Sequence, residues 1–317
     1  MKIIDIHAHG IGGYDTRTTA EGDILKIAEI QGSYGISEII LSVYSAPIPI
    51  MRENMEAVKR AMEKQQSSAS AGISRRQSAP PPIPPPRGGR VREGGQAPNS
   101  KLARIIGLHL EGPFLNPSRC GALSAASFVE PTGYKLKELI EGFEEIVKIM
   151  TIAPEIKGAA GLIKKMSDRG IIVGMGHSDA TYADAEAGFN AGAKGITHIF
   201  NAMRSFHHRE PGLAGFGLLN QDIYIEVIAD PYHLHSKTLE LIFKTKNPYR
   251  IIIVSDTVKE SKIGEEKDQG ITNIHGRLSG GCMTITESSK RLIKTGYNES
   301  AIMDCITKNP ESYISSF

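Results

Sequence analysis

RIIIVSD, residues 250–256, is the stretch that decides the fold. It contains the unbroken β-branched run IIIV and ends in a carboxylate, a pattern typical of a parallel strand buried on both faces. Other short apolar runs share this character, and the eight strands that the sequence predicts are 3–9, 38–43, 105–111, 147–153, 171–177, 195–200, 224–229 and 251–255.

Helix-like patterns lie between these strands, at 20–34, 50–64, 135–145, 155–168, 180–191, 236–244 and 299–308. Eight strands that alternate with helices predict an α/β fold, a (β/α)8 TIM-like barrel. An open doubly wound sheet is the alternative. The strand count and the polar residues at the carboxyl ends of strands favour the barrel, because barrel enzymes keep their sites there.

The composition argues against several classes of protein. The 317 residues carry 37 basic and 35 acidic side chains, and a net charge of +2 does not favour a nucleic-acid partner. Three cysteines without a CxxC pair argue against a disulfide framework. No stretch approaches the roughly 18 apolar residues of a membrane span, and the amino terminus lacks the pattern of a signal peptide. We therefore expect a cytoplasmic protein with no membrane partner.

One segment, 65–100, interrupts the barrel pattern between the second expected helix and the third strand. It is rich in Ser, Pro, Gly and Arg and nearly devoid of large apolar side chains, so it cannot offset the entropy cost of ordering. We predict a single domain over 1–317 that carries a disordered insertion at 65–100. The run APPPIPPP favours polyproline II and would suit a small Pro-binding module, although a linker without a partner is the simpler interpretation.

Histidines and a glutamate stand at the ends of several expected strands. His7 and His9 end the first strand, and both imidazoles point to one mouth of the barrel because side chains two residues apart share a face. Glu111, His177 and His198 end three further strands. Each alone has a plain structural explanation, such as a turn carboxylate or a hydrogen-bonded core histidine. Together they predict one or two divalent metal ions, with zinc or iron suited to imidazole.

Asp256 ends the last expected strand, which would lie beside the first. A carboxylate in that place can accept a proton from a metal-activated water and return it to a leaving amine. A helix-capping aspartate is the plain alternative.

Two loops near the barrel mouth offer contacts for a substrate. Asn201 and Ala202 follow the sixth strand, and Arg209 has the planar fork of donors that suits a phosphate. His233, after the seventh strand, suits a hydroxyl or a phosphate. A solvated surface arginine is the plain alternative for Arg209.

A series of motifs spans nearly the whole chain outside the insertion, in the order IDIHAHGIGGYDT, GLHLEGPFLNP, TIAPE, GHSDAT, THIFNAM, HREPGLAG, IADPYHLH, VSDT and LSGGCMTI. HLEGPFLNP together with THIFNAM is a specific combination. The series resembles the N-acetylglucosamine-6-phosphate deacetylases of the amidohydrolase superfamily, whose barrels are of the metal-dependent hydrolase type.

The resemblance implies a reaction and a set of metal ligands. The reaction is hydrolysis of N-acetylglucosamine 6-phosphate to glucosamine 6-phosphate and acetate. Glu111, His177 and His198 would bind the principal metal, and Asp256 would be the general acid/base. The pair of histidines at 7 and 9 would hold a second metal bridged by Glu111, as in the two-metal members of the family.

The resemblance also implies how the amino sugar phosphate is held. Asn201, the backbone of Ala202, Arg209 and His233 would contact it, and in the family the arginine reaches across the interface of a homodimer. A homodimer with a small-molecule substrate is therefore expected.

Three departures from the family pattern bear on this expectation. The strands of the small β-sandwich that flanks the family's barrel are not found, and the 65–100 insertion is foreign to the family. The family's loop after LNP leads to Gly-Ala-His, whose histidine helps to polarise the acetyl carbonyl, whereas this chain has Gly121-Ala122-Leu123. A second metal at His7 and His9 would supply that polarisation instead.

Two other interpretations stay open. The enzyme could act on another N-acyl amino sugar or on a cyclic amide. A catalytically impaired barrel could instead serve as an interaction scaffold through its Pro- and Arg-rich insertion, which the substitution by Leu123 favours. Measurements of the metal content, of acetate release and of the dependence of activity on Arg209 distinguish these interpretations.

Overall fold

Eight parallel strands form the central sheet of the computed structural model, which describes residues 2–77, 102–262 and 269–315. The last strand returns to the first, since the Asp256 backbone N–H donates to the His7 carbonyl oxygen at 2.8 Å. The predicted (β/α)8 barrel is confirmed. In their order around the sheet the strands are β1 (Ile4–Ala8), β4 (Glu38–Tyr44), β5 (Arg104–Glu111), β6 (Val147–Ile152), β7 (Ile172–Met175), β8 (Gly195–Ile196), β9 (Tyr224–Ile228) and β10 (Ile251–Val254).

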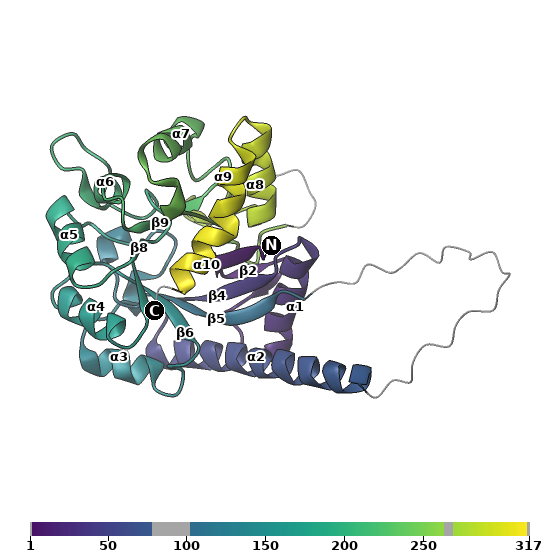
Figure 1. Ribbon diagram of the computed structural model, residues 1–317. Helices are drawn as coiled ribbons and strands as arrows, with labels where there is room; N and C mark the ends of the chain where they lie inside the picture. The colour runs from purple at the N-terminus through teal and green to yellow at the C-terminus, as the bar shows by residue number, and fades with distance from the viewer. Residues whose placement is uncertain (1, 78–101, 263–268, 316–317) are drawn as a thin grey trace.

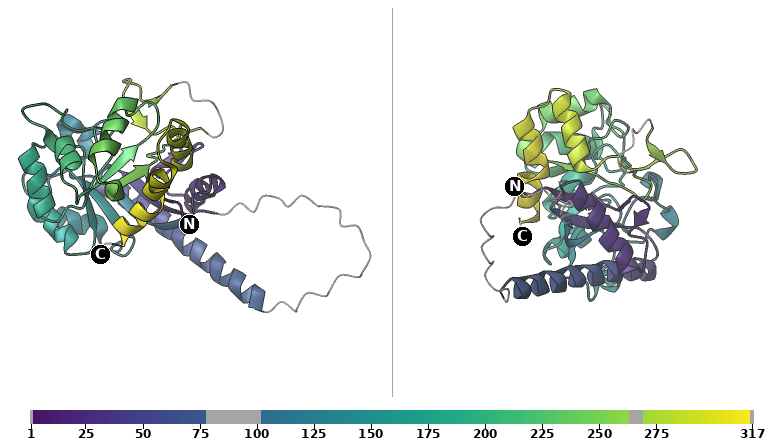
Figure 2. Two further views of the ribbon diagram at one scale, coloured as in Figure 1. Left: turned by 45° about the horizontal axis from the view of Figure 1, so that its top comes forward. Right: turned by 90° about the vertical axis from the view of Figure 1, so that its right-hand side faces the viewer.

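Helices surround this barrel on the outside, as Figure 1 shows. Their apolar faces pack on the outer face of the sheet and form the larger of two hydrophobic cores. Figure 2 shows that the far end of α2 extends away from the barrel. The helices are α1 (Glu21–Ser33), α2 (Ile48–Gln77), α3 (Gly133–Ile140), α4 (Ala159–Ser167), α5 (Tyr182–Asn190), α6 (Gly212–Leu219), α7 (Ser236–Thr245), α8 (Ile285–Lys294), α9 (Glu299–Ile306) and α10 (Lys308–Ile314).

The smaller core fills the inside of the barrel. It joins strand residues such as Ile6, Ile149 and Ile252 to Tyr313 of α10. The Tyr313 ring lies 4.8 Å from the ring of Tyr224, which begins β9. α10 therefore closes the amino-terminal end of the barrel, and the carboxyl ends of the strands form the open mouth.

Short elements follow the carboxyl ends of β1 and β10. β2 (Gly10–Ile11) pairs with β3 (Tyr14–Asp15), and β11 (Ile271–Thr272) pairs with β12 (Leu278–Gly280). Single turns of 3-10 helix complete the described elements, at η1 (Pro117–Arg119), η2 (Ala125–Ser127) and η3 (Pro248–Arg250).

Several predicted boundaries are wrong, among them the ends of α2 and β8. α2 continues to Gln77, so residues 65–77 are helical rather than part of a disordered insertion. This extension, QQSSASAGISRRQ, contains Gln, Ala and Arg, which have good helix propensity. The rest of that predicted insertion, 78–100, lies outside the described residues. β8 ends at Ile196 rather than at residue 200, because the backbone turns at left-handed residues from His198 onward.

Across residues 2–77, 102–262 and 269–315, none of the helices combines the length and the apolar character needed to cross a membrane.

Gly281 permits a close approach between the loop after β12 and the end of β10. Its N–H donates to the Asp256 carbonyl oxygen at 2.7 Å, and an added Cβ would lie 1.9 Å from the Ser255 carbonyl oxygen. We predict that Gly281→Ala lowers the free energy of unfolding by about 1–3 kcal/mol, because the backbone must shift. Denaturant unfolding followed by circular dichroism measures this.

Gly161→Ala is the matched control, because nothing lies within 4 Å of the added Cβ on α4. It should leave the free energy of unfolding unchanged or raise it by up to about 1 kcal/mol. Equal effects of the two variants would contradict the role of close approach at Gly281.

Candidate active site

The barrel mouth brings together the six residues that the sequence predicts as its chemical centre. His7 lies in β1 and His9 just after it, and Glu111 is the last residue of β5. His177, His198 and Asp256 follow β7, β8 and β10 by two residues each. Their side chains are at most 12% exposed, so the group is almost completely removed from water.

Three of these residues have left-handed backbone conformations. The φ angles are 48° at His177, 32° at His198 and 48° at Asp256. Residues with a Cβ adopt this region at an energetic cost, and such residues cluster where a site demands a particular side-chain direction. With these turns, His177 and His198 contact Glu111, and Asp256 contacts His7.

The carboxylate of Glu111 contacts the imidazoles of both His177 and His198. Its Oε1 lies 3.0 Å from the Nε2 of His177 and 3.0 Å from the Nε2 of His198, and the two Nε2 atoms are 3.2 Å apart. The three ligand atoms lie within 4.8 Å of one another, as a bound metal ion requires.

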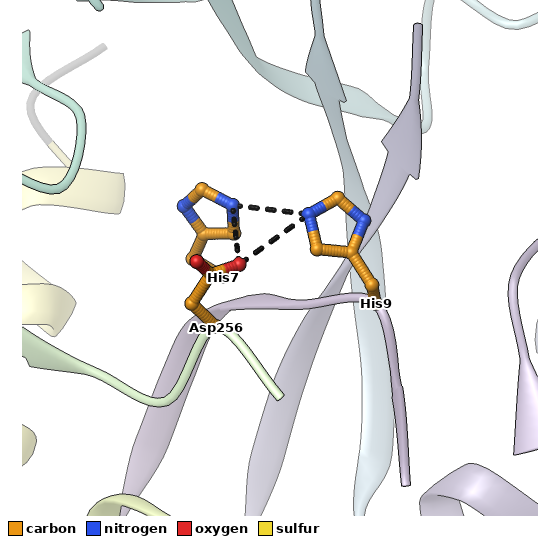
Figure 3. A group of neighbouring side chains, drawn as sticks. All are labelled: His7, His9 and Asp256. Atoms are coloured by element: carbon orange, nitrogen blue, oxygen red, sulfur yellow. Dashed lines mark hydrogen bonds and ion pairs between the residues drawn. The ribbon is translucent and has the colours of Figure 1, made fainter. Parts of the chain in front are cut away.

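A second group stands beside the first and is drawn in Figure 3. The Nε2 of His7 lies 3.3 Å from the Nε2 of His9 and 3.4 Å from Oδ1 of Asp256, which is 3.5 Å from His9. Glu111 Oε2 lies 3.3 Å from the same nitrogen of His9. Glu111 therefore faces both groups, as a bridging carboxylate would.

The hydrogen-bond partner of His177 Nδ1 indicates that a cation fits between His177 and Glu111. Its Nδ1 lies 3.0 Å from the carbonyl oxygen of Arg119, which can only accept, so Nδ1 carries a proton. In the neutral ring, Nε2 then turns a lone pair toward the Glu111 carboxylate, and the two repel unless a positive charge lies between them. Two imidazoles and one carboxylate are a donor set typical of zinc and related divalent ions.

The surroundings of the two carboxylates at the mouth, Glu111 and Asp256, shift their pKa values in opposite directions. Burial acts to raise the pKa of Glu111, but the surrounding side chains of His177, His198 and His9 hold it well below its usual value. Burial, together with the charges of Glu111 and Glu226, raises the pKa of Asp256 well above its usual value. Glu111 is suited to remain an anion, and Asp256 is suited to take up a proton and release it again.

The site opens into a pocket of about 820 Å³. Asn201, Ala202, His233 and Leu123 line it together with the residues at the mouth other than His7. Of the predicted substrate contacts, Arg209 alone does not line it. Arg209 is exposed on the loop before α6, where its Nη1 lies 3.3 Å from His208 Nε2.

Several residues at the site were missed by the sequence analysis. The Oδ2 of Asp230 lies 2.9 Å from Nδ1 of His233, and the Oε2 of Glu226 lies 2.9 Å from Nδ1 of His7. Arg277, beyond β11, reaches the Gly121 carbonyl oxygen at 3.1 Å. Asp230 stands in the motif IADPYHLH, which was a usable signal, whereas Glu226 and Arg277 carry no local pattern that distinguishes them.

Known proteins with similar sequences are deacetylases of amino sugar phosphates. The N-acetylglucosamine-6-phosphate deacetylase of Lysinibacillus sphaericus is 32% identical over 207 residues, covering 62% of this chain and 54% of that protein. The enzyme of that name from Bacillus subtilis (strain 168) is 34% identical over 217 residues, covering 64% and 54%. The N-acetylgalactosamine-6-phosphate deacetylase of Escherichia coli O157:H7 is 27% identical over 302 residues, covering 92% and 71%. The chain spans about half the length of the first two relatives, and no family model matches it.

Solved structures share the fold. The Thermotoga maritima N-acetylglucosamine-6-phosphate deacetylase matches with a TM-score of 0.80 at 24% identity, covering 99% of this chain and 78% of that one. The Mycobacterium smegmatis enzyme in complex with N-acetyl-D-glucosamine-6-phosphate matches with a TM-score of 0.78 at 21% identity, covering 99% and 77%. In sequence and in fold, this chain is therefore a homologue of the N-acetylglucosamine-6-phosphate deacetylases, as its motifs predicted.

Proposed function

We propose that this protein hydrolyses the acetamide of N-acetylglucosamine 6-phosphate, releasing acetate and glucosamine 6-phosphate. The observation that carries the proposal is the convergence of Glu111, His177 and His198 beside Asp256 at the mouth of a pocket. Relatives that bear this activity in their names support the choice of substrate.

Glu111, His177 and His198 would hold the principal divalent cation, with zinc or iron as the first candidates. His7 and His9, with Asp256 beside them, would hold a second. A bound cation supplies Lewis acidity to a water molecule and to a carbonyl oxygen. The protein contributes a buried setting in which the His7 imidazole stays neutral, since burial holds the pKa of His7 well below its usual value.

Asp256 would move the proton of the reaction. It accepts a proton from the attacking water and returns it to the nitrogen of the leaving amine, which must be protonated before the C–N bond breaks. The distances of 3.4 and 3.5 Å from its Oδ1 to the Nε2 atoms of His7 and His9 support this role.

Asn201, the Ala202 backbone, Arg209 and His233 would hold the sugar phosphate. Asp230 accepts from His233 Nδ1, so His233 presents its other ring nitrogen to the pocket. Arg209 would act from the partner subunit of a homodimer, because it lies outside the pocket of its own chain.

Leu123 lines the pocket where the family pattern has a histidine. It cannot donate a hydrogen bond to the acetyl carbonyl, so a second cation at His7 and His9 would take over the polarisation of that oxygen. Activity should therefore require two cations per chain.

A turnover assay tests the proposed function. Purified protein loaded with zinc should release acetate from N-acetylglucosamine 6-phosphate faster than from the unphosphorylated sugar. N-acetylgalactosamine 6-phosphate is the second candidate substrate, supported by the relative that matches 92% of this chain. Protein that binds zinc but releases acetate from none of these sugars would exclude the deacetylase and favour the scaffold interpretation.

Arg209→Ala should raise the KM for the phosphorylated sugar by roughly 10–100-fold with little change in kcat, as expected for the loss of a charged hydrogen bond. The KM for the unphosphorylated sugar should not change. Steady-state kinetics on the two sugars measure this.

Arg277→Ala is the comparison, because Arg277 lines the pocket within the same chain. A rise in KM for Arg277→Ala with none for Arg209→Ala would contradict the assignment and move the phosphate contact to Arg277.

A further inference from the structure

A second layer of buried polar side chains lies beneath the mouth. His7, His109 and Glu226 project from β1, β5 and β9, and their ligand atoms lie within 4.8 Å of one another. None of the three is more than 1% exposed. The mechanism proposed above uses His7 alone, which leaves Glu226 without a stated role.

His7 belongs to both layers through the two nitrogens of its ring. Nδ1 lies 2.9 Å from Oε2 of Glu226, and Nε2 lies 3.3 Å from His9 and 3.4 Å from Asp256. Figure 3 shows the contacts of His7 with His9 and Asp256. A neutral imidazole has one N–H, so the partner of Nδ1 decides whether Nε2 presents a lone pair or a proton to the mouth.

Packing holds the His7 ring in this orientation. The His109 ring meets it edge to face, with centroids 4.4 Å apart and planes at 68°. His109 is itself fixed by Thr151, whose Oγ1 lies 2.7 Å from His109 Nε2 and 2.8 Å from Thr197 Oγ1. A ring so enclosed cannot turn to exchange its two nitrogens without displacing the layer.

We propose that Glu226 is a positioning residue that makes His7, His9 and Asp256 a second cation site. As an anion it accepts from Nδ1–H of His7, which fixes the tautomer with a bare Nε2 that faces His9 and Asp256. A carboxylate that orients a ligating histidine in this way also raises its basicity. The inference rests on the proposed function only in that a cation is bound at the mouth.

In the competing arrangement, Glu226 rather than His7 carries the proton of the hydrogen bond between them. A protonated Glu226 would donate to the same Nδ1 of His7 across the 2.9 Å contact. The His7 proton would then sit on Nε2 and repel a cation. The two arrangements differ in the tautomer of one histidine, which is measurable without any cation.

The first test is the ¹⁵N spectrum of the His7 ring in cation-free wild-type protein near neutral pH, with His7→Gln used to assign the signals. We expect the proton on Nδ1. A proton on Nε2 overturns the proposal. Because this readout needs neither cation nor substrate, it stands even if the protein proves not to be a deacetylase.

The second test is zinc stoichiometry and affinity, by calorimetric titration and elemental analysis of the full chain. Wild type should bind two ions per chain. Glu226→Met should weaken the second ion by about 10–100-fold and leave the first unchanged. Two ions bound with wild-type affinity in Glu226→Met would overturn the proposal, whereas no ion bound by wild type would refute the proposed cation centre instead.

Thr151→Val is the matched control. It removes the buried hydroxyl that contacts His109 in the same layer. It leaves the contact between Glu226 and His7 in place. It should keep both ions. Loss of the second ion in Thr151→Val as well would show that any disturbance of the layer suffices, and the specific role of Glu226 would be wrong.

Discussion

Asp256→Asn should lower kcat for acetate release by about 10²–10⁴-fold, the usual contribution of a general acid/base. The amide keeps the size of the carboxylate but can neither accept the proton of water nor return it to the leaving amine. The native side chain is suited to this task because burial, with the charges of Glu111 and Glu226, raises its pKa. Single-turnover kinetics with zinc-loaded protein measure the change.

Zinc content separates this effect from loss of the cation. Glu111, His177 and His198 form their group without Asp256, so the principal ion should stay bound in Asp256→Asn. Asp222→Asn, an exposed change just before β9 at the closed end of the barrel, is the control and should keep wild-type kcat. Turnover by Asp256→Asn within tenfold of wild type would contradict the assignment.

Glu111→Gln should abolish both cation binding and turnover, and it is the change with the widest effect. Among the carboxylates of the described residues, Glu111 alone contacts both groups, through Oε1 to His177 and His198 and through Oε2 to His9. An amide offers a single oxygen without charge and turns N–H donors toward imidazole lone pairs. Removing Lewis acidity worth several kcal/mol predicts a loss of kcat/KM of at least about 10³-fold.

Thermal unfolding with and without zinc reports the same loss without an activity assay. Zinc at a hundred times its dissociation constant should stabilise the wild type by about 2.7 kcal/mol, and it should not raise the Tm of Glu111→Gln. Chelator-treated wild type is the control and should match the variant. A zinc-dependent rise in Tm that persists in Glu111→Gln would refute the bridging role.

The fold could be predicted because its signals are local. Apolar runs such as IIIV at 251–254 are short and continuous, and their number and alternation with helices leave few arrangements. The elements that escaped prediction carry weaker signals. α6 contains three glycines in GLAGFGLL, and α8 begins with β-branched Ile285, although its capping box of Thr284 and Glu287 is a helix-start pattern.

Predicting the site depended on strand ends that meet in space. His7, Glu111, His177, His198 and Asp256 are far apart in the chain, and a parallel barrel alone is enough to bring them to one mouth. The direction of each side chain was not predictable, since it depends on left-handed backbone at positions such as His177 and Asp256. Such conformations are imposed by surrounding contacts rather than by residue type.

The sequence by itself therefore determined the barrel, the residues at its mouth and the resemblance to the deacetylases, because each depends on local pattern or on motif. The tertiary structure alone decided that Glu111 faces two histidine groups, that Arg209 lies outside the pocket of its own chain and that Glu226 lies beneath His7. These are contacts between residues distant in the chain, and their distances follow from strand register and backbone turns that no short stretch of sequence contains.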